Sequence, residues 1–215
     1  MEEFNKKTKH DFDLEVVLDA LKKCRLNDDT VLLSEYIRAY RELCRFFKLT
    51  GRLFGFVARD LEGKIAIVEK HRNLDKDNNY VSVQSILKYE SSKGIAKIKS
   101  PLASGSRTLL RLHNAFEFII AFMRRVREGP ENEKTSKIAA EVYNQTLSNH
   151  HPWPVQKMAL LAVHLLPPKK QLIDVMCKHE YSRVMELLDD VISYGQPIYD
   201  ITESVYKEHD LLVIP

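Results

Sequence analysis

Apolar residues recur at helical spacing through nearly the whole chain. No stretch shows the sustained alternation of apolar and polar residues that indicates a half-buried β-strand. The sequence also contains only 7 glycines, so positions that favour turn conformations are few. Together these features predict an all-α fold. We expect helical segments at residues 13–24, 32–47, 53–72, 81–91, 106–127, 135–147, 154–166, 169–178, 182–193 and 198–209.

The length of the chain limits how these helices can be organised. Its 215 residues are enough to build one substantial hydrophobic core. No shift in composition, linker or internal repeat separates two parts, although turn signals interrupt the helices, including one at residues 195–197. We therefore expect a single domain over residues 12–215, preceded by a flexible, charged segment at residues 1–11.

Composition argues against several classes of protein. The formal net charge of +3 is too small to indicate nucleic-acid binding from bulk charge alone. The three cysteines, Cys24, Cys44 and Cys177, form no CxxC pair, which is typical of a reducing compartment. The N-terminus has no secretory apolar region, and the apolar run near residues 158–168 is shorter than the ~20 residues that span a bilayer. These features predict a cytosolic protein.

Two charges interrupt an apolar face of the predicted helix 53–72. Helical spacing places on this face Leu53, Phe56, Val57, Asp60, Lys64, Ile67 and His71. Asp60 and Lys64 should therefore be partly buried, and a buried charge costs several kcal/mol unless a partner satisfies it. A plain salt bridge between these two side chains is the structural alternative, but an exposed i,i+4 pair contributes only about 0.3–0.5 kcal/mol. The pattern indicates a further polar partner.

Arg107 and Arg111 occupy one sector of the predicted helix 106–127, and Phe118 and Phe122 continue that sector further along. A ligand with an anionic head and an apolar tail matches this gradation. The two arginines repel each other by a few tenths of a kcal/mol, so an anion between them removes a cost. We expect free backbone N–H groups in the first helical turn to add to the attraction. A solvated face, or pairs with local carboxylates, is the structural alternative.

The segment at residues 149–154, NHHPWP, contains His151 and the single tryptophan, Trp153. Its prolines stiffen the chain, and Pro154 suits the first position of a helix. The pair His150–His151 lacks the cysteines or carboxylates that zinc requires at its usual spacing, so we expect no metal and no cofactor. By itself His151 is typical of a satisfied structural histidine, and Trp153 is typical of either a core or an interface.

Four segments together resemble the glycolipid transfer protein family. They are GRLFGFVARDLEGK at 51–64, SGSRTLLRLHNAF at 104–116, NHHPWPVQK at 149–157 and VYKEHDLLVIP at 205–215. The resemblance runs from about residue 12 to the end of the printed sequence. It implies a two-layer helical sandwich of about eight helices that encloses an apolar lipid pocket. It also implies transfer of a lipid between membranes without a covalent step, and therefore no enzyme.

The resemblance further implies which lipid is carried. Members that carry sugar-headed lipids have a tryptophan where this chain has Arg111, and an asparagine where it has Lys64. The implied cargo is therefore a sphingolipid with a phosphate head group, ceramide-1-phosphate. Lys64, Arg107 and Arg111 would clamp the phosphate. Asp60 would accept from the amide N–H of the lipid, and His151 would donate to its amide carbonyl.

Other residues receive supporting roles. Trp153 is expected to pack beside the head-group site and help to order it, and Lys97 and Lys99 are further basic candidates nearby. The candidate pocket-lining residues are Phe46, Phe54, Phe56, Phe118 and Phe122. Aromatic and basic side chains are preferred at bilayer surfaces. The candidate membrane-docking residues are Tyr40, Trp153, Lys169 and Lys170.

We expect the partners to be ceramide-1-phosphate and membrane surfaces, such as those of the Golgi and the plasma membrane, visited transiently by a monomer that binds no nucleic acid. Transfer or sensing of a neutral glycosphingolipid is the nearest alternative. A helical adaptor protein without lipid cargo is another, and it predicts exposed arginines and no large internal cavity. A lipid-cleaving enzyme is disfavoured because the chain has no GxSxG or HExxH motif.

Overall fold

The computed structural model describes residues 12–50, 52–98 and 102–214, without the side chains of residues 52, 53, 175 and 176. This part of the chain contains nine α-helices and one short 3-10 helix, so the all-α prediction is confirmed. In chain order the elements are α1 (Leu14–Cys24), α2 (Leu33–Leu49), α3 (Arg52–Leu74), α4 (Val83–Ser92), α5 (Gly105–Glu128), α6 (Thr135–Gln145), η1 (Leu147–His150), α7 (Trp153–Val163), α8 (Lys169–Met176) and α9 (Tyr181–Glu208).

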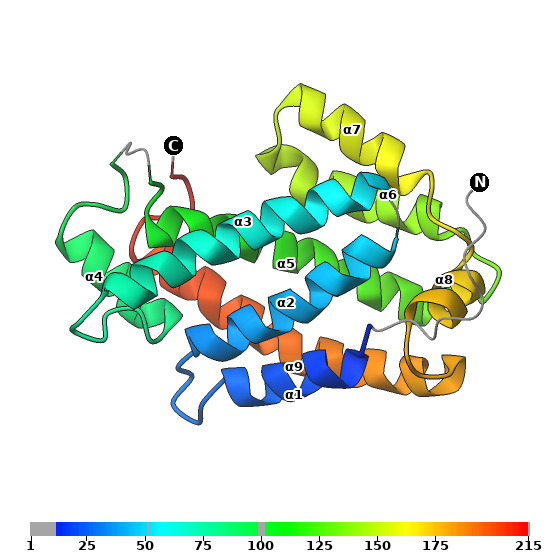
Figure 1. The fold of residues 1–215 in the computed structure, drawn as a ribbon, viewed down its shortest axis with the longest axis horizontal. Helices are drawn as coiled ribbons and strands as arrows, with labels where there is room; N and C mark the ends of the chain where they lie inside the picture. Colours follow the sequence, from blue (N-terminus) through cyan, green and yellow to red (C-terminus); the bar gives the residue numbers. More distant parts are fainter. Residues whose placement is uncertain (1–11, 51, 99–101, 215) are drawn as a thin grey trace.

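The helices form two packed layers (Figure 1). Helices α1, α2 and α3 form the layer nearer the viewer, and α5, α6 and α9 lie behind it. The layers are joined where α1 packs on α9 and where α3 packs on α5. Helix α5 is central, and its buried apolar residues include Leu109, Leu112, Phe116, Ile119 and Ile120. The predicted two-layer helical sandwich is therefore confirmed.

Side-chain caps fix the beginnings of α4 and α5. The hydroxyls of Ser82 and Ser85 each accept a hydrogen bond from the other residue's backbone N–H, at 3.0 Å. At α5, the Oγ of Ser104 accepts from the backbone N–H of Arg107 at 3.2 Å. Such caps satisfy N–H groups that have no partner inside the helix, and each typically contributes about 1 kcal/mol. The register of α5, and with it the position of Arg107, follows from this cap.

The predicted break in the last helix, at residues 195–197, is wrong. Helix α9 runs unbroken, with Pro197 inside it, although a proline removes one helical hydrogen bond. A Cβ atom on Gly195 would lie 3.3 Å from Cδ1 of Ile120 and 3.5 Å from the ring of Phe116, so α9 passes very close to α5 at this point. Packing between two long helices outweighs the local helix-breaking signal, and the predicted segments 182–193 and 198–209 form one helix.

Helix α3 buries a different face from the predicted one. Its buried apolar residues are Phe54, Ala58, Leu61, Ile65 and Val68. This face packs between α2 and α5, which leaves Phe56 and Val57 exposed by 54% and 38%. The predicted apolar face therefore runs along the border of the face that is packed. Asp60 and Lys64 lie on this border, where their charges remain within reach of solvent.

Helix α7 lies on the outside of the fold, packed against α6 (Figure 1). Only Ala162 and Val163 of this helix are buried. Large apolar side chains that stay exposed on α7 and just after it are Trp153, Val155, Met158, Leu161 and Leu165. In the part of the chain that the structure describes, no helix combines the length and hydropathy needed to cross a bilayer.

Candidate functional site

A cavity of about 470 Å³ opens between α3, α5, α6, α7 and the C-terminal segment. Its volume falls in the range of small-molecule sites. The polar and charged residues that line it are Asp60, Lys64, Arg107, Arg111, Asn114, Tyr143, Asn149, His150 and His151. The fold therefore brings together, at one cavity, all five residues that the sequence analysis selected as ligand-binding candidates.

A second, narrower cavity of about 80 Å³ continues into the core, and its lining is entirely apolar apart from the thiol of Cys177. Both cavities are lined by Phe47, Phe54, Phe118, Ile119 and Val163. Of the candidate pocket-lining residues, Phe46, Phe54, Phe118 and Phe122 line this apolar cavity. Together the two cavities place a charged opening above an apolar interior.

Phe56 was predicted to line the pocket, and the structure places it elsewhere. Its ring lies on the exposed side of α3 and contributes to neither cavity. The guanidinium of Arg59 lies 4.4 Å from the centre of this ring, which is a cation–π contact. The prediction fails because the face of α3 that is buried is rotated away from the apolar face that was predicted.

Asp60 and Lys64 form an ion pair with each other. The Nζ of Lys64 donates to the carboxylate of Asp60 one helical turn earlier. The side chain of Lys64 is 17% exposed, and that of Asp60 is 66% exposed. The simple salt bridge of the structural alternative is therefore formed, but both residues also line the cavity. Because Asp60 is so exposed, its carboxylate can accept a further hydrogen bond there.

No carboxylate of the described residues neutralises Arg107 or Arg111. Arg107 is 8% exposed, and its Nη2 donates to the carbonyl of Lys97 at 3.4 Å. Within the part of the chain that the structure describes, the Nε of Arg107 is buried without a hydrogen-bond partner, while Arg111 is exposed. Neither guanidinium forms a salt bridge with a carboxylate of residues 12–50, 52–98 or 102–214. A buried arginine without an anion is costly, so an anion bound here would remove that cost.

The expected contribution of free amides at the start of α5 is wrong. The carboxylate of Glu90 accepts from the backbone N–H groups of Gly105 and Ser106, both at 2.8 Å. The third N–H, that of Arg107, donates to Ser104. Glu90 is fully buried, and it also accepts from the hydroxyl of Tyr80 at 2.6 Å. An internal carboxylate thus occupies these backbone N–H groups, so an anion at this site would have to be bound by side chains.

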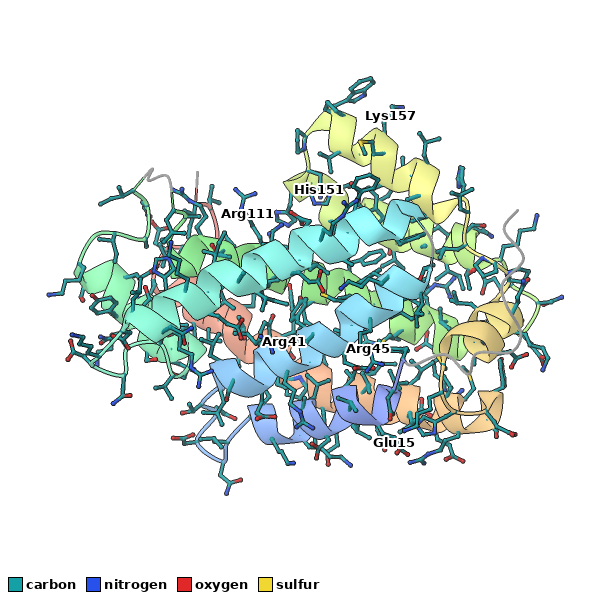
Figure 2. The ribbon with its side chains drawn as sticks, viewed as in Figure 1. Glu15, Arg41, Arg45, Arg111, His151 and Lys157 are labelled. Atoms are coloured by element: carbon teal, nitrogen blue, oxygen red, sulfur yellow. The ribbon has the colours of Figure 1, made fainter. Side chains whose placement is uncertain are left out.

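His151 lines the cavity from the segment just after η1. Figure 2 shows its side chain near that of Arg111, in the space between α3 and α7. The Nδ1 of His151 lies 2.9 Å from the hydroxyl of Tyr143. Burial lowers the pKa of His151, and the positive charges of Lys64 and Arg111 act in the same direction, whereas Asp60 opposes them. The ring is therefore neutral near pH 7 and can donate one hydrogen bond.

Trp153 does not pack beside the head-group site as predicted. It is 68% exposed at the start of α7 and is not part of the cavity lining. The Nζ of Lys157 lies 5.7 Å from the centre of its ring. The indole is exposed because it stands at the start of α7, whose buried residues, Ala162 and Val163, lie at the other end of the helix.

Two of the four candidate docking residues are buried. Tyr40 is fully buried and donates from its hydroxyl to the carbonyl of Leu112. Lys169 is 2% exposed, and its Nζ donates to the carbonyl of Gly129 at 2.7 Å. Both therefore fail as docking residues, because each polar tip bonds to a backbone carbonyl inside the fold. Lys170 and Trp153 remain exposed.

The further basic candidates do not join the site in the described structure. The side chain of Lys97 extends to Asp210, with Nζ 3.0 Å from the carboxylate. Only the backbone carbonyl of Lys97 faces Arg107. Lys99 lies outside the described residues.

A family model described as "Glycolipid transfer protein (GLTP)" matches residues 31–178. The chain belongs to the glycolipid transfer protein family. Among curated relatives, a ceramide-1-phosphate transfer protein of Rattus norvegicus is 34% identical over 210 residues, which cover 95% of this chain and 97% of the relative. The ceramide-1-phosphate transfer protein of Homo sapiens is 31% identical over 207 residues, which cover 95% of this chain and 97% of the relative.

Solved structures agree with this membership of the glycolipid transfer protein family. The apo form of mouse ceramide-1-phosphate transfer protein matches with a TM-score of 0.89 and 35% identity, covering 95% of this chain and all of that one. The human protein in complex with 2:0 ceramide-1-phosphate matches with a TM-score of 0.88 and 31% identity, covering 95% of this chain and 99% of that one.

The sequence analysis missed Asn114 and Tyr143 of the cavity lining, and Glu90, which binds the start of α5. Asn114 follows Arg111 by three residues, so helical spacing could have placed both at the cavity. Tyr143 looks like an ordinary core residue in the pattern of α6, and Glu90 like a surface charge of α4. Their roles depend on contacts with residues 8 and 15 positions away, which local periodicity does not reveal.

Proposed function

We propose that this protein carries ceramide-1-phosphate between membranes and leaves it chemically unchanged. The observation that carries this proposal is the pair of unneutralised arginines, Arg107 and Arg111, at the mouth of a cavity with an apolar interior. The relatives named as ceramide-1-phosphate transfer proteins, each covered nearly end to end, support it.

The phosphate would sit between Lys64, Arg107 and Arg111. A phosphomonoester carries about −1.5 to −2 charges near neutral pH. The planar guanidinium fits phosphate oxygens in a bidentate arrangement, and each charge-assisted hydrogen bond contributes about 1.5–3 kcal/mol. The Nζ of Lys64 can turn from Asp60 toward the phosphate, because its only salt bridge within the described residues is with Asp60.

The amide of the ceramide would be held by Asp60 and His151. Once Lys64 turns to the phosphate, the carboxylate of Asp60 accepts from the amide N–H. The neutral ring of His151 donates to the amide carbonyl. The two residues line the same cavity from different elements, α3 and the segment just after η1, so an amide between them can satisfy both.

The hydrocarbon chains would enter the apolar cavity lined by Phe46, Phe54, Phe118 and Phe122. Burying about 30 methylenes contributes on the order of 25 kcal/mol, but the bilayer offers the lipid about the same amount. Chain burial therefore permits extraction without selecting a lipid. Selection must come from the charged opening.

Docking to the membrane would use the exposed apolar face of α7. Met158, Leu161 and Leu165 are 57–66% exposed, and Trp153 and Lys157 add the aromatic and basic side chains that bilayer interfaces favour. We place the protein in the cytosol as a monomer, bound transiently to membranes such as those of the Golgi and the plasma membrane. Residues 12–215 would act as one lipid-transfer domain, after a flexible segment at residues 1–11, without a cofactor, a metal or nucleic acid.

Vesicle transfer of labelled ceramide-1-phosphate, glucosylceramide and phosphatidic acid tests this function. We expect ceramide-1-phosphate to move fastest and to be recovered with unchanged mass. Equal transfer of glucosylceramide would instead identify a carrier of neutral glycosphingolipids. No transfer of any of the three lipids would favour an adaptor, and a changed mass would reveal an enzyme.

A further inference from the structure

We propose that Tyr143 is a positioning residue that fixes the tautomer of His151, so that the Nε2–H of the ring is the donor presented to the cavity. This inference rests on the proposed function, since it specifies how one wall of that site recognises the amide carbonyl. It concerns a residue that does not need to touch the lipid itself.

The geometry of the pair is well defined. Tyr143 is 3% exposed on α6, and its hydroxyl lies 2.9 Å from Nδ1 of His151. The ring of Phe118 meets the ring of Tyr143 edge-on, with centroids 6.4 Å apart and planes at 78°. Tyr143 is therefore held from the α5 side, while its hydroxyl points to the imidazole.

The backbone of His151 is fixed as well. The side-chain amide of Gln156 donates to the carbonyl of His151 at 2.9 Å and to the carbonyl of Ser148 at 2.8 Å. The N–H of His151 donates to the same Ser148 carbonyl at 3.2 Å. With the main chain held on one side and Nδ1 on the other, the ring has little freedom to turn.

The direction of the hydrogen bond follows from the inventory of partners. In the described part of the chain, Nδ1 is the one hydrogen-bond partner of the Tyr143 hydroxyl. If Nδ1 carried the proton and donated to the hydroxyl, the hydroxyl proton would have no acceptor there, which is costly for a buried group. The hydroxyl therefore donates and Nδ1 accepts.

The charges around the pair favour the same state. Burial raises the pKa of Tyr143, so its hydroxyl keeps its proton. Burial also lowers the pKa of His151; Lys64, His150 and Arg111 add to this effect, and Asp60 opposes it. A neutral imidazole has a single proton, and with Nδ1 accepting, that proton is on Nε2.

This arrangement decides what His151 can recognise. An Nε2–H donates to a carbonyl oxygen, whereas a bare Nε2 would repel it. Without the Tyr143 hydroxyl, both neutral tautomers become populated, and part of the protein presents the wrong group. Binding of the amide then weakens, while the phosphate contacts of the arginines on α5 are unaffected.

Nitrogen-15 NMR of the imidazole side chains, together with vesicle transfer, tests this inference on the full chain. Wild type should show His151 with protonated Nε2 and unprotonated Nδ1. Tyr143→Phe should shift His151 toward a tautomer mixture and slow ceramide-1-phosphate transfer about 2- to 12-fold, the range of one neutral hydrogen bond. Tyr89→Phe, which removes a hydroxyl from a half-buried tyrosine on α4, is the control and should change neither readout.

A double-mutant cycle separates positioning from a structural role. His151→Gln has no tautomer to fix, so adding Tyr143→Phe to it should cost no further transfer. A wild-type ring protonated on Nδ1, or additive losses in the cycle, would overturn the inference. The NMR result does not depend on the cargo, so failure of the proposed function is recognised separately, by the absence of ceramide-1-phosphate transfer in the wild type.

Discussion

The carboxylate of Glu90 accepts the backbone N–H of Gly105 at 2.8 Å, across the junction between α4 and α5. With the matching bond to Ser106, this contact anchors the first turn of the helix that presents both arginines. A helix start is often an anion site in its own right. Here the protein fills it with its own carboxylate, which leaves the guanidinium groups as the proposed anion-binding elements of α5.

Glu90→Gln should destabilise the protein by about 1.5–3 kcal/mol. A glutamine side chain retains one oxygen, but its NH₂ group then faces a backbone N–H, so one buried donor loses its acceptor. The thermal midpoint should fall by about 3–12 °C, as measured by circular dichroism. Glu128→Gln, at the exposed end of α5, is the control. Equal midpoints for the two variants would show that the contact contributes nothing.

Arg111→Leu should abolish most transfer of phosphate-headed lipid and leave the fold intact. The side chain is exposed, so the thermal midpoint should move by about 2 °C or less. Transfer should fall about 10- to 150-fold, as expected for one charge-assisted contact. Arg72→Leu removes the same charge from the exposed end of α3 and should transfer normally. If Arg111→Leu unfolds instead, the arginine is structural.

Leu161→Glu should weaken binding to vesicles of phosphatidylcholine and phosphatidylserine by at least about tenfold, since an inserted leucine contributes about 1.5–3 kcal/mol. Leu161 is 64% exposed on α7, and Leu74, at the far end of α3, is 68% exposed. Leu74→Glu is therefore the matched control in the same co-sedimentation assay. Identical binding by the two variants would rule out α7 as the docking surface.

His113 should make stability depend on pH. It is fully buried between the rings of Tyr199 and Tyr206, and burial lowers its pKa below 6.5 although Glu203 opposes the shift. The unfolded chain therefore takes up a proton first, so the free energy of unfolding falls as the pH drops below about 6.5.

Urea denaturation between pH 5 and pH 7 measures this contribution. His113→Gln should show a smaller loss of unfolding free energy on acidification than the wild type. His164→Gln, at an exposed position after α7, should retain the wild-type dependence. The same pH dependence in all three proteins would assign it to other groups.

Helical periodicity was sufficient to predict an all-α fold, because every layer is built from amphipathic helices, whereas the two-layer arrangement was implied by the family resemblance. It failed at Pro197, where the local signal favours a break. The deciding contact is that of Gly195 with Ile120 on α5, which joins residues 75 positions apart and leaves no mark on either local pattern. Packing against α5 therefore keeps α9 continuous at this point.

The candidate site was predictable where its residues break a pattern. Charges at Asp60, Arg107 and Arg111 are conspicuous beside apolar residues, and the family resemblance connected them to His151. Exposure was not predictable in the same way. Tyr40 looks like a candidate for an interface, but the carbonyl that its hydroxyl reaches belongs to Leu112, and only the folded chain brings the two together.

The salt bridge between Asp60 and Lys64 has a consequence for the order of events at a membrane. Their charges cancel each other, so the opening of the cavity carries the positive charge of Arg107 and Arg111. A bound phosphate, with a charge of about −1.5 to −2, cancels most of this positive charge. Under the proposed function, an anionic bilayer attracts the empty carrier more strongly than the loaded one, by about 1 kcal/mol per basic side chain near its surface. Vesicle affinities of the two forms at low salt measure this difference. Binding of the lipid would thereby weaken the attraction between the carrier and the bilayer that supplied the lipid.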